Sequence, residues 1–130
     1  MAIPGAVLVV DDDAGCLLLA VRMLEWLGVQ RIGQAANAVE AKREIATGGY
    51  DVVLMDISMP GMSGVELCRL VRLLPAARHM AIHACTAHAG RADETWLKSE
   101  GFDSVLTKPF LLEDLTRVLE MKGRAAPAVT

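Results

Sequence analysis

Five polar side chains in this sequence come directly after apolar runs. Asp11 and Asp12 follow the first such run, Asp56 follows the third, Thr86 the fourth and Lys108 the fifth. If the runs are strands of one parallel sheet, their carboxyl ends share one edge, and ligands bind in the crevice at that edge. The sequence therefore predicts one cleft that holds three acids, a hydroxyl group and a lysine.

The chemistry of such a cleft follows from its charges. Carboxylates a few ångströms apart disfavour joint ionisation, so a hard divalent cation is needed to compensate them. Oxygen ligands without histidine or cysteine suit Mg²⁺ better than zinc. With Mg²⁺ and Lys108 present, negative charge can accumulate on a phosphoryl group. Asp56 is then the expected nucleophile, which accepts that group as an aspartyl phosphate.

The elements that position these residues alternate along the chain. Short apolar runs bounded by turn residues indicate strands, and longer segments with helical period indicate helices. The predicted strands are 6–10, 30–36, 51–55, 80–85 and 103–107. The predicted helices are 14–27, 38–47, 64–74, 90–100 and 111–122. Five such units, with central strands apolar on both faces, predict an α/β fold with a doubly covered parallel sheet.

Two helices carry clear core stripes. The first has Asp13 as its expected N-cap and Gly28 just past its end. Its stripe consists of Leu17, Val21, Leu24 and Leu27. The stripe of the last helix consists of Leu112, Leu115, Val118 and Leu119. These stripes predict the faces on which the two helices pack against the sheet.

Four short motifs together resemble the receiver domain of two-component response regulators. They are "VLVVDDD", "LMDISMPGMSG", "CTAHA" and "TKPF", in this order, and the resemblance covers about residues 6–122. It implies a flavodoxin-like (βα)₅ fold with strand order 2-1-3-4-5. We expect one domain over residues 1–130, with a core of about 6–122 and a flexible tail at 123–130.

The resemblance also assigns roles to the site residues. Asp56 becomes the phosphoacceptor, and Asp11, Asp12 and Asp56 hold Mg²⁺ directly or through water. The backbone carbonyl of Ser58 is a further metal ligand, Thr86 binds a phosphoryl oxygen and Lys108 pairs with the added charge. The bond between Lys108 and Pro109 is cis in the family. The domain is then no conventional enzyme, although it assists its own phosphorylation and dephosphorylation.

One position departs from the family pattern. In many receivers Thr86 moves toward the phosphoryl group, and an aromatic residue three positions before the lysine turns inward behind it. That switch position is Val105 here, and valine has no ring to relocate and few rotamers. We therefore expect a muted response on the surface of the fourth and fifth helices.

The first helix is apolar beyond its core stripe. In the receiver family, this helix and the loop after the fifth strand bind phosphodonor helices. The residues expected to dock such a partner are Leu18, Leu19, Met23, Trp26 and Phe110. The expected partner is a histidine kinase or a histidine phosphotransfer protein. The motif wording also resembles receivers at the C-terminal end of hybrid sensor kinases, of which this chain would be a fragment. Packing of these side chains against a neighbouring domain or in the core remains the alternative.

The sequence also offers a phosphatase site and a transition-metal site as alternatives. "VLVVDDDAG" fits the Asp-x-Asp pattern of haloacid-dehalogenase-type phosphatases, in which Asp11 is the nucleophile and Asp13 the general acid. That alternative leaves Asp56 unexplained. His83, Cys85 and His88 form a second candidate, a transition-metal site, but His88 lies beyond the strand end, so a core histidine and a surface histidine are the simpler interpretation.

Composition limits partners and location. With 13 basic and 16 acidic residues the formal charge is −3, so we expect no binding to nucleic acid and no direct membrane contact. The start lacks the basic and small-residue features of a signal peptide. Three widely spaced cysteines in apolar surroundings indicate reduced thiols. We expect a cytoplasmic protein.

Overall fold

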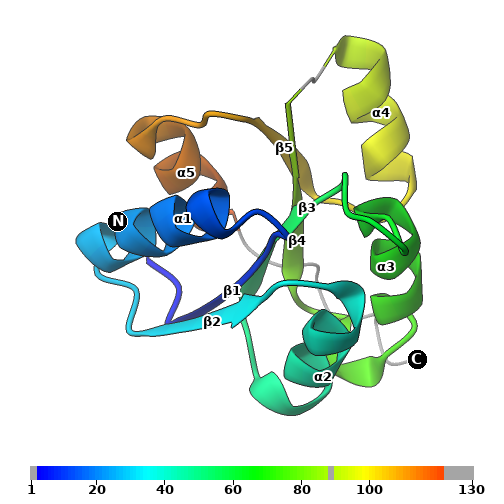
Figure 1. Cartoon of the computed structure of the whole chain (residues 1–130), viewed down its shortest axis with the longest axis horizontal. Helices are drawn as coiled ribbons and strands as arrows, with labels where there is room; N and C mark the ends of the chain where they lie inside the picture. The colour runs from blue at the N-terminus through cyan, green and yellow to red at the C-terminus, as the bar shows by residue number, and fades with distance from the viewer. Residues whose placement is uncertain (1–2, 88–89, 122–130) are drawn as a thin grey trace, which may run out of the picture.

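A computed structural model describes residues 3–87 and 90–121, as a parallel sheet between two layers of helices (Figure 1). The strands are β1 (Ala6–Val10), β2 (Arg31–Ala35), β3 (Val52–Asp56), β4 (Ala81–Thr86) and β5 (Ser104–Thr107). The helices are α1 (Ala14–Leu27), α2 (Ala38–Gly48), α3 (Gly64–Val71), the 3₁₀ turn η1 (Pro75–Ala77), α4 (Arg91–Ser99) and α5 (Leu112–Leu119).

The sheet has the order β2-β1-β3-β4-β5, and all paired strands are parallel. Helices α1 and α5 cover one face, and α2, α3 and α4 lie on the other (Figure 1). This is the flavodoxin-like arrangement, as predicted. The chain reverses its direction across the sheet between β1 and β3, so a crevice opens at the carboxyl ends of these two strands.

The core forms on both faces of the sheet, since every residue of β1, β3 and β4 is buried. Such strands read as continuous apolar runs because both faces are covered. Leu24 of α1 is fully buried, and Leu17, Val21 and Leu27 pack against the same core, which confirms that stripe. In α5, Leu115, Val118 and Leu119 are buried. Leu112 is 37% exposed and lies beside Trp26, so its assignment to the core was wrong.

Helix ends follow local chemistry where the sequence provides caps. The Asp13 side chain accepts a hydrogen bond from the Cys16 N–H, and Gly28 ends α1 with a φ of 89°. Both caps were predicted. Helix α3 instead ends at Val71, three residues earlier than expected. The reason is Pro75, which holds Leu74 in an extended conformation with ψ of 134°.

A half-buried arginine joins several elements at the amino ends of β4 and β5. Arg72, just after α3, donates hydrogen bonds to the carbonyls of Ala77, Met80 and Gly101. It also pairs with Asp103 at 2.7 Å, and Asp103 accepts the Ile82 N–H as well. The guanidinium is thereby satisfied by four partners. This cluster fixes α3, η1 and the start of β5 to one another.

Trp96 and the three cysteines differ in how far they are exposed to solvent. Trp96 of α4 is 49% exposed. Cys16, Cys68 and Cys85 are not joined by disulfide bonds, and Cys68 and Cys85 are buried. Within residues 3–87 and 90–121, no helix has the length and apolar character needed to cross a membrane.

Candidate functional site

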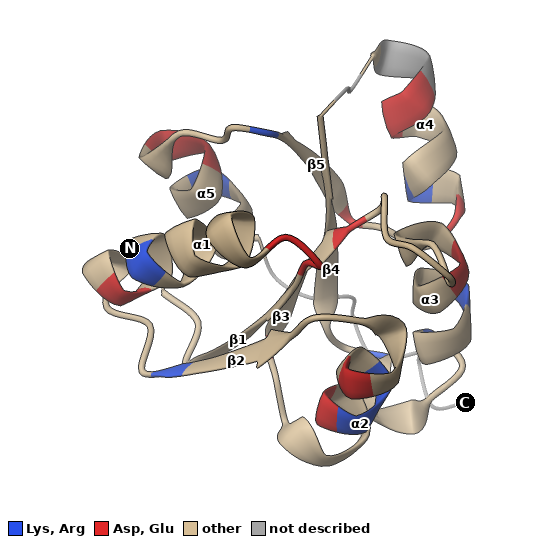
Figure 2. Ribbon diagram, viewed as in Figure 1, with Lys and Arg blue, Asp and Glu red and all other residues tan. Residues whose placement is uncertain are grey.

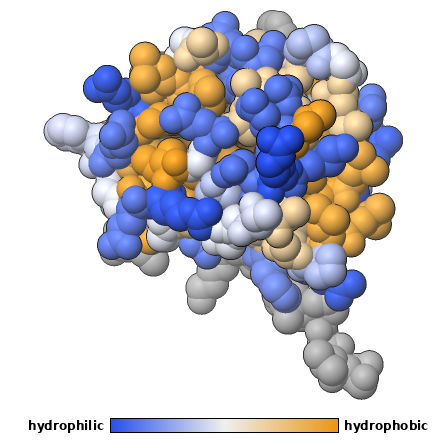
Figure 3. Space-filling view, turned by 60° about the horizontal axis from the view of Figure 1, so that its bottom comes forward, coloured by the Kyte–Doolittle hydropathy of each residue, from blue (hydrophilic) through white to orange (hydrophobic). Residues whose placement is uncertain are grey.

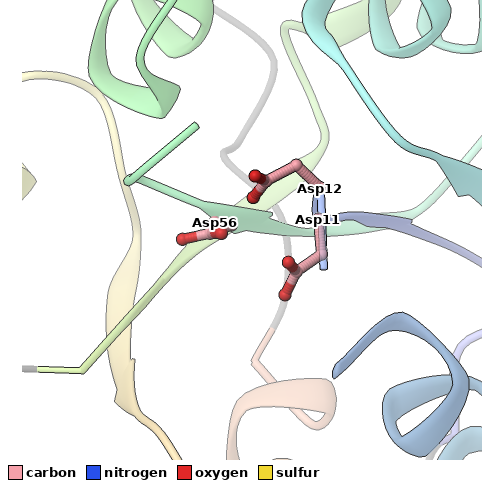
Figure 4. A group of neighbouring side chains, drawn as sticks. All are labelled: Asp11, Asp12 and Asp56. Carbon is pink, nitrogen blue, oxygen red and sulfur yellow. The ribbon is translucent and has the colours of Figure 1, made fainter. Parts of the chain in front are cut away.

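Three aspartates meet at the carboxyl edge of the sheet. Asp11 and Asp12 follow β1, and Asp56 is the last residue of β3. One carboxylate oxygen from each lies within 4.8 Å of the other two (Figure 4). The acidic segments after β1 and at the end of β3 also lie together at the centre of the ribbon in Figure 2. Asp11 and Asp56 are buried, whereas Asp12 is exposed at the cleft.

Asp56 is held from one side by the turn that follows it. Its Oδ1 accepts the backbone N–H of Ser58 at 3.0 Å. Burial raises the pKa of Asp56, and the neighbouring Asp11 acts in the same direction, while the Ser58 N–H and the charge of Lys108 oppose the rise. The carboxylate is therefore destabilised by its surroundings until more positive charge arrives.

Lys108 is the cation of this cluster. Its Nζ lies 2.6 Å from Oδ2 of Asp11 and 3.6 Å from Oδ2 of Asp56. Burial disfavours the charged ammonium, but the hydrogen bond and attraction from Asp11, together with Asp56, outweigh it and raise the pKa of Lys108. The bond between Lys108 and Pro109 is cis, as predicted. Lys108 is thus protonated and bound mainly to Asp11.

Thr86 and Val105 complete the predicted set. Thr86 is buried as the last residue of β4, and its carbonyl accepts the Lys108 N–H at 2.7 Å. This bond ties the ends of β4 and β5 together at the cleft. Val105 is half-buried and packs against the core on the side of α2, α3 and α4. The structure therefore brings Thr86 and Lys108 to the acidic edge and leaves Val105 behind it.

Gly64 was not identified from the sequence, although it shapes this edge. A Cβ atom at this position would lie 2.2 Å from the Asp56 carbonyl oxygen and 2.7 Å from Cα of Ile57. Only a residue without a side chain lets the start of α3 approach the end of β3 this closely. The clue in the sequence was the Ser-Gly pair at the helix start.

The donor set fits a hard cation. The carboxylate oxygens of Asp11, Asp12 and Asp56 carry more negative charge than Lys108 neutralises. Each Mg²⁺–oxygen bond is about 2.1 Å, so opposite ligands lie about 4.2 Å apart. Oxygens within 4.8 Å of one another are thus close to the spacing needed to share one ion, directly or through water. These residues fit Mg²⁺.

The alternative metal site does not assemble in the part of the chain that is described. His83 is fully buried, its Nδ1 lies 2.7 Å from the Ser104 hydroxyl, and burial lowers its pKa to about 4. Burial also raises the pKa of Cys85 to about 12, so its thiol stays protonated. His88 lies outside the described residues. Among those described, the three aspartates are the one group placed to hold a metal ion.

The predicted docking residues divide into two groups. Leu18, Leu19 and Trp26 are exposed, with Trp26 at 80%. Met23 and Phe110 are half-buried and pack against the core, so they contribute less surface than expected. In Figure 3 hydrophobic side chains gather on the side of the molecule that holds α1 and α5, and a band of hydrophilic side chains separates them from a second group.

Comparisons with known proteins give a consistent result. The response regulator receiver domain family matches residues 7–120. The sensor histidine kinase GacS of Pseudomonas protegens is 36% identical over 116 residues, which are 87% of this chain and 12% of that protein. The transcriptional regulatory protein YvrH of Bacillus subtilis is 35% identical over 105 residues, 81% of this chain and 43% of that protein. The chain thus spans about an eighth of the GacS kinase.

Solved structures agree with these relatives. The chemotaxis protein CheY4 of Vibrio cholerae superposes with a TM-score of 0.83 at 28% identity, covering 92% of this chain and 98% of that one. The receiver domain of the sensor histidine kinase PA1611 from Pseudomonas aeruginosa has a TM-score of 0.81 at 30% identity, covering 89% and 94%. That structure has a magnesium ion coordinated in its active-site cleft.

The phosphatase alternative finds no support. Asp13, its expected general acid, is exposed and caps α1 through the Cys16 N–H. The family match and the solved structures point to receiver domains and not to phosphatases, and Asp56 is one of the three aspartates of the acidic cluster. By its sequence over residues 7–120, its strand order and its structural neighbours, the chain belongs to the response regulator receiver domain family of two-component signalling.

Proposed function

We propose that Asp56 accepts a phosphoryl group from a phosphohistidine donor in a Mg²⁺-dependent reaction. A carboxylate oxygen of Asp56 forms the new bond to phosphorus while the bond from phosphorus to the donor's imidazole nitrogen breaks. The electron pair of the broken bond stays on that nitrogen. Phosphoryl transfer needs mostly positioning and charge stabilisation from a protein, and both are available at this edge.

The observation that carries this proposal is the state of the Asp56 carboxylate. It is buried at the end of a rigid central strand, fixed at Oδ1 by the Ser58 N–H, and lies 3.6 Å from the Lys108 ammonium. A nucleophile needs this kind of fixed orientation. Asp11 is also held in place, by the Asp13 N–H at 2.9 Å, but Lys108 engages its other oxygen at 2.6 Å, and Asp12 is exposed.

The other site residues take supporting roles in the proposal. Asp11, Asp12, Asp56 and the Ser58 carbonyl hold Mg²⁺, which neutralises charge on the transferred group when bound. Lys108 shifts from Asp11 toward the phosphoryl oxygens, and Thr86 donates its hydroxyl to one of them. The same groups are available for hydrolysis, so we also propose that the domain assists its own phosphorylation and dephosphorylation.

Intact-mass measurement after incubation with acetyl phosphate tests the acceptor. We expect the native chain to gain one phosphoryl group only when Mg²⁺ is present, and Asp56→Asn to gain none. Asp51→Asn is the matched control, because Asp51 lies at the opposite end of β3 and accepts the Ala6 N–H. Labelling of Asp56→Asn, or equal labelling of the native chain with and without Mg²⁺, would contradict the proposal.

The second part of the proposal concerns the partner. Leu18, Leu19 and Trp26 form an exposed apolar surface on α1, the helix that begins beside Asp11 and Asp12. Exposed apolar surface next to a reaction centre is typical of a docking site. Because several relatives are sensor histidine kinases, the proposed occupant is the helix of a histidine kinase or histidine phosphotransfer protein that carries the phosphohistidine.

Paired charge substitutions test the docking surface. We expect Leu19→Lys and Trp26→Lys to slow transfer from a phosphorylated donor protein about tenfold or more, while acetyl-phosphate labelling is unchanged. Leu73→Lys is the control, because Leu73 is 77% exposed but follows α3 on the other side of the sheet. Equal transfer rates for Trp26→Lys and Leu73→Lys would exclude this surface.

Three further proposals concern the switch position Val105, the longer protein and the compartment. The muted response expected from Val105 predicts that beryllofluoride shifts NMR signals around Asp56 more than those of α4 and α5. The chain's small share of the GacS kinase supports its being a piece of a larger hybrid kinase or a relay protein. The absence of disulfide bonds among Cys16, Cys68 and Cys85 favours a reducing compartment, and hence the cytoplasm.

A further inference from the structure

A cavity of about 270 Å³ lies between α1 and the loop that joins β5 to α5. It opens on the same face of the sheet as α5 and shares Asp11 and Lys108 with the acidic cluster. Its main wall is apolar and consists of Val9, Leu19, Ala20, Leu54, Cys85 and Phe110. Leu19 at the mouth of this space also belongs to the proposed docking surface, but the interior at Ala20, Leu54 and Cys85 has no role in phosphoryl transfer to Asp56.

Small side chains keep the cavity open. Ala20 is 4% exposed on the side of α1 that faces the sheet, where a larger residue would reach the strands. Cys85 of β4 lies beneath it, and Cys16 lines the rim. The floor is rigid, because Val9 and Leu54 are registered neighbours in β1 and β3. The space is therefore part of a well-packed frame.

The lining selects an uncharged aromatic ligand. Lys108 is already paired with Asp11 at 2.6 Å, so an anionic ligand finds no unpaired cation in this lining, and a ligand of either charge loses its hydration against the apolar wall. The Phe110 ring and the sulfur atoms of Cys16 and Cys85 make favourable contacts with aromatic rings. An apolar cavity of about 150 Å³ accepts benzene.

We propose that this cavity, lined by Ala20, Leu54, Cys85 and Phe110, is a binding site for a neutral aromatic molecule of two fused rings. Its occupant packs against the segment that carries Lys108 and holds that lysine on Asp11. Resting on the proposed function, this contact makes the ligand a brake on phosphorylation of Asp56. By linkage, the factor by which the ligand lowers the equilibrium extent of phosphorylation is also the factor by which phosphorylation weakens the ligand's binding, although the labelling rate need not change by that factor.

Indole is the probe for the binding test, which needs no phosphorylation. We expect saturable NMR shifts at the amides of the lining residues when indole is added to the full chain. Ala20→Leu fills the cavity and abolishes these shifts without lowering the midpoint of thermal unfolding. Cys16→Phe closes the cavity from its half-exposed rim and is the second variant. Leu18→Ala, on the same helix but outside the cavity, is the control and binds as the native chain does.

Charged analogues test the chemical class. Indole-3-acetate and tryptamine are expected to bind at least about tenfold more weakly than indole, which corresponds to 1.4 kcal/mol. The site proposal is overturned if lining amides show no saturable shift, or if both cavity-filling variants bind like the native chain. Equal affinity for a charged analogue overturns the neutral class.

The brake is measured separately, as the rate of acetyl-phosphate labelling with and without saturating indole. A fall in rate for the native chain, absent in Ala20→Leu, supports the coupling, and an unchanged rate overturns it. If the native chain binds indole but takes no phosphoryl group at all, the proposed function fails while the binding site stands.

Discussion

Two clusters of charged side chains, largely removed from solvent, lie at opposite ends of the sheet. They differ in how fully their charges are neutralised within the chain. At the amino ends of β4 and β5, Arg72 faces Asp103 and three backbone carbonyls, so each charge is matched within the chain. At the carboxyl edge, Lys108 faces Asp11 and Asp56 with Asp12 nearby, so negative charge is in excess.

The two clusters serve different purposes, since one stabilises the fold and the other can bind a ligand. A satisfied ion pair needs nothing further and serves to hold elements in place. A cluster with uncompensated charge stores electrostatic free energy that a ligand can release on binding. We therefore expect substitutions at the Arg72 cluster to reduce stability with little effect on chemistry, and substitutions at the Asp56 cluster to do the reverse.

The largest effect is expected at the satisfied cluster. Arg72→Met leaves Asp103 buried without its partner and should lower the free energy of unfolding by about 3 to 5 kcal/mol. Urea denaturation measures this loss. Arg22→Met is the control, because its pair with Glu25 is 3.9 Å long and solvent-exposed and contributes little. A loss at Arg72 no larger than that at Arg22 would mean that the pair with Asp103 does not stabilise the fold.

The second effect concerns pH near the same cluster. Burial lowers the pKa of His83 to about 4. The charge of Asp103 and the backbone of Val118 oppose this with smaller effects, and the charge of Arg72 adds to the lowering. The unfolded chain takes up this proton near pH 6.5, so stability is full above that pH and is lost as the pH falls toward 4. The loss should reach about 3 kcal/mol and be absent in His83→Leu. An NMR titration in which the His83 imidazole itself has a pKa near 6.5 would contradict this prediction.

The third effect distinguishes the clusters by their need for metal. Mg²⁺ at one hundred times its dissociation constant should raise the free energy of unfolding of the native chain by about 2.7 kcal/mol. Arg72→Met should gain the same increment, whereas Asp56→Asn should gain much less. Thermal unfolding with and without Mg²⁺ measures both. An equal increment in Asp56→Asn would remove Asp56 from the metal site.

The smallest expected effect is a gain in stability on substitution, where Arg72→Met gives a loss. Without Mg²⁺, Asp56→Asn should be more stable than the native chain by about 1 kcal/mol, because it removes one charge from the crowded edge. The pKa of Asp56 is raised in the folded state, so the native chain loses stability as the pH rises from the unfolded value through the folded one. The advantage of the variant should grow over this window, and Asp103→Asn should instead be destabilised. Equilibrium unfolding at several pH values checks the sign.

Much of this arrangement could be predicted where local chemistry decides it. Asp13 and Gly28 set the ends of α1, and the strand ends placed Asp11, Asp56, Thr86 and Lys108 at one edge. Elements that depend on packing were less predictable. Leu112 has a core-like spacing in α5, yet it lies at the surface near α1.

The features that escaped prediction involve residues far apart in the chain. Arg72 reaches Gly101 and Asp103 only because the end of α3 packs against the loop between α4 and β5, and nothing in its local sequence signals this. Lys108 Nζ lies about one ångström closer to the Asp11 oxygen than to the Asp56 oxygen, and a difference this small is not encoded in the local sequence. The cavity beside Ala20 depends on side chains from α1, three strands and the loop after β5.

The exposure of the two tryptophans provides optical reporters for opposite sides of the molecule. Trp26 on α1 is 80% exposed, and Trp96 on α4 is 49% exposed. Replacing one by phenylalanine leaves a single indole whose emission reports on the other side alone. A chain that retains Trp26 should show a blue shift and reduced quenching when a donor protein docks, and one that retains Trp96 should follow any movement of α4 when Asp56 is phosphorylated. Two single-tryptophan variants thus report separately on the docking of the donor and on the response of α4.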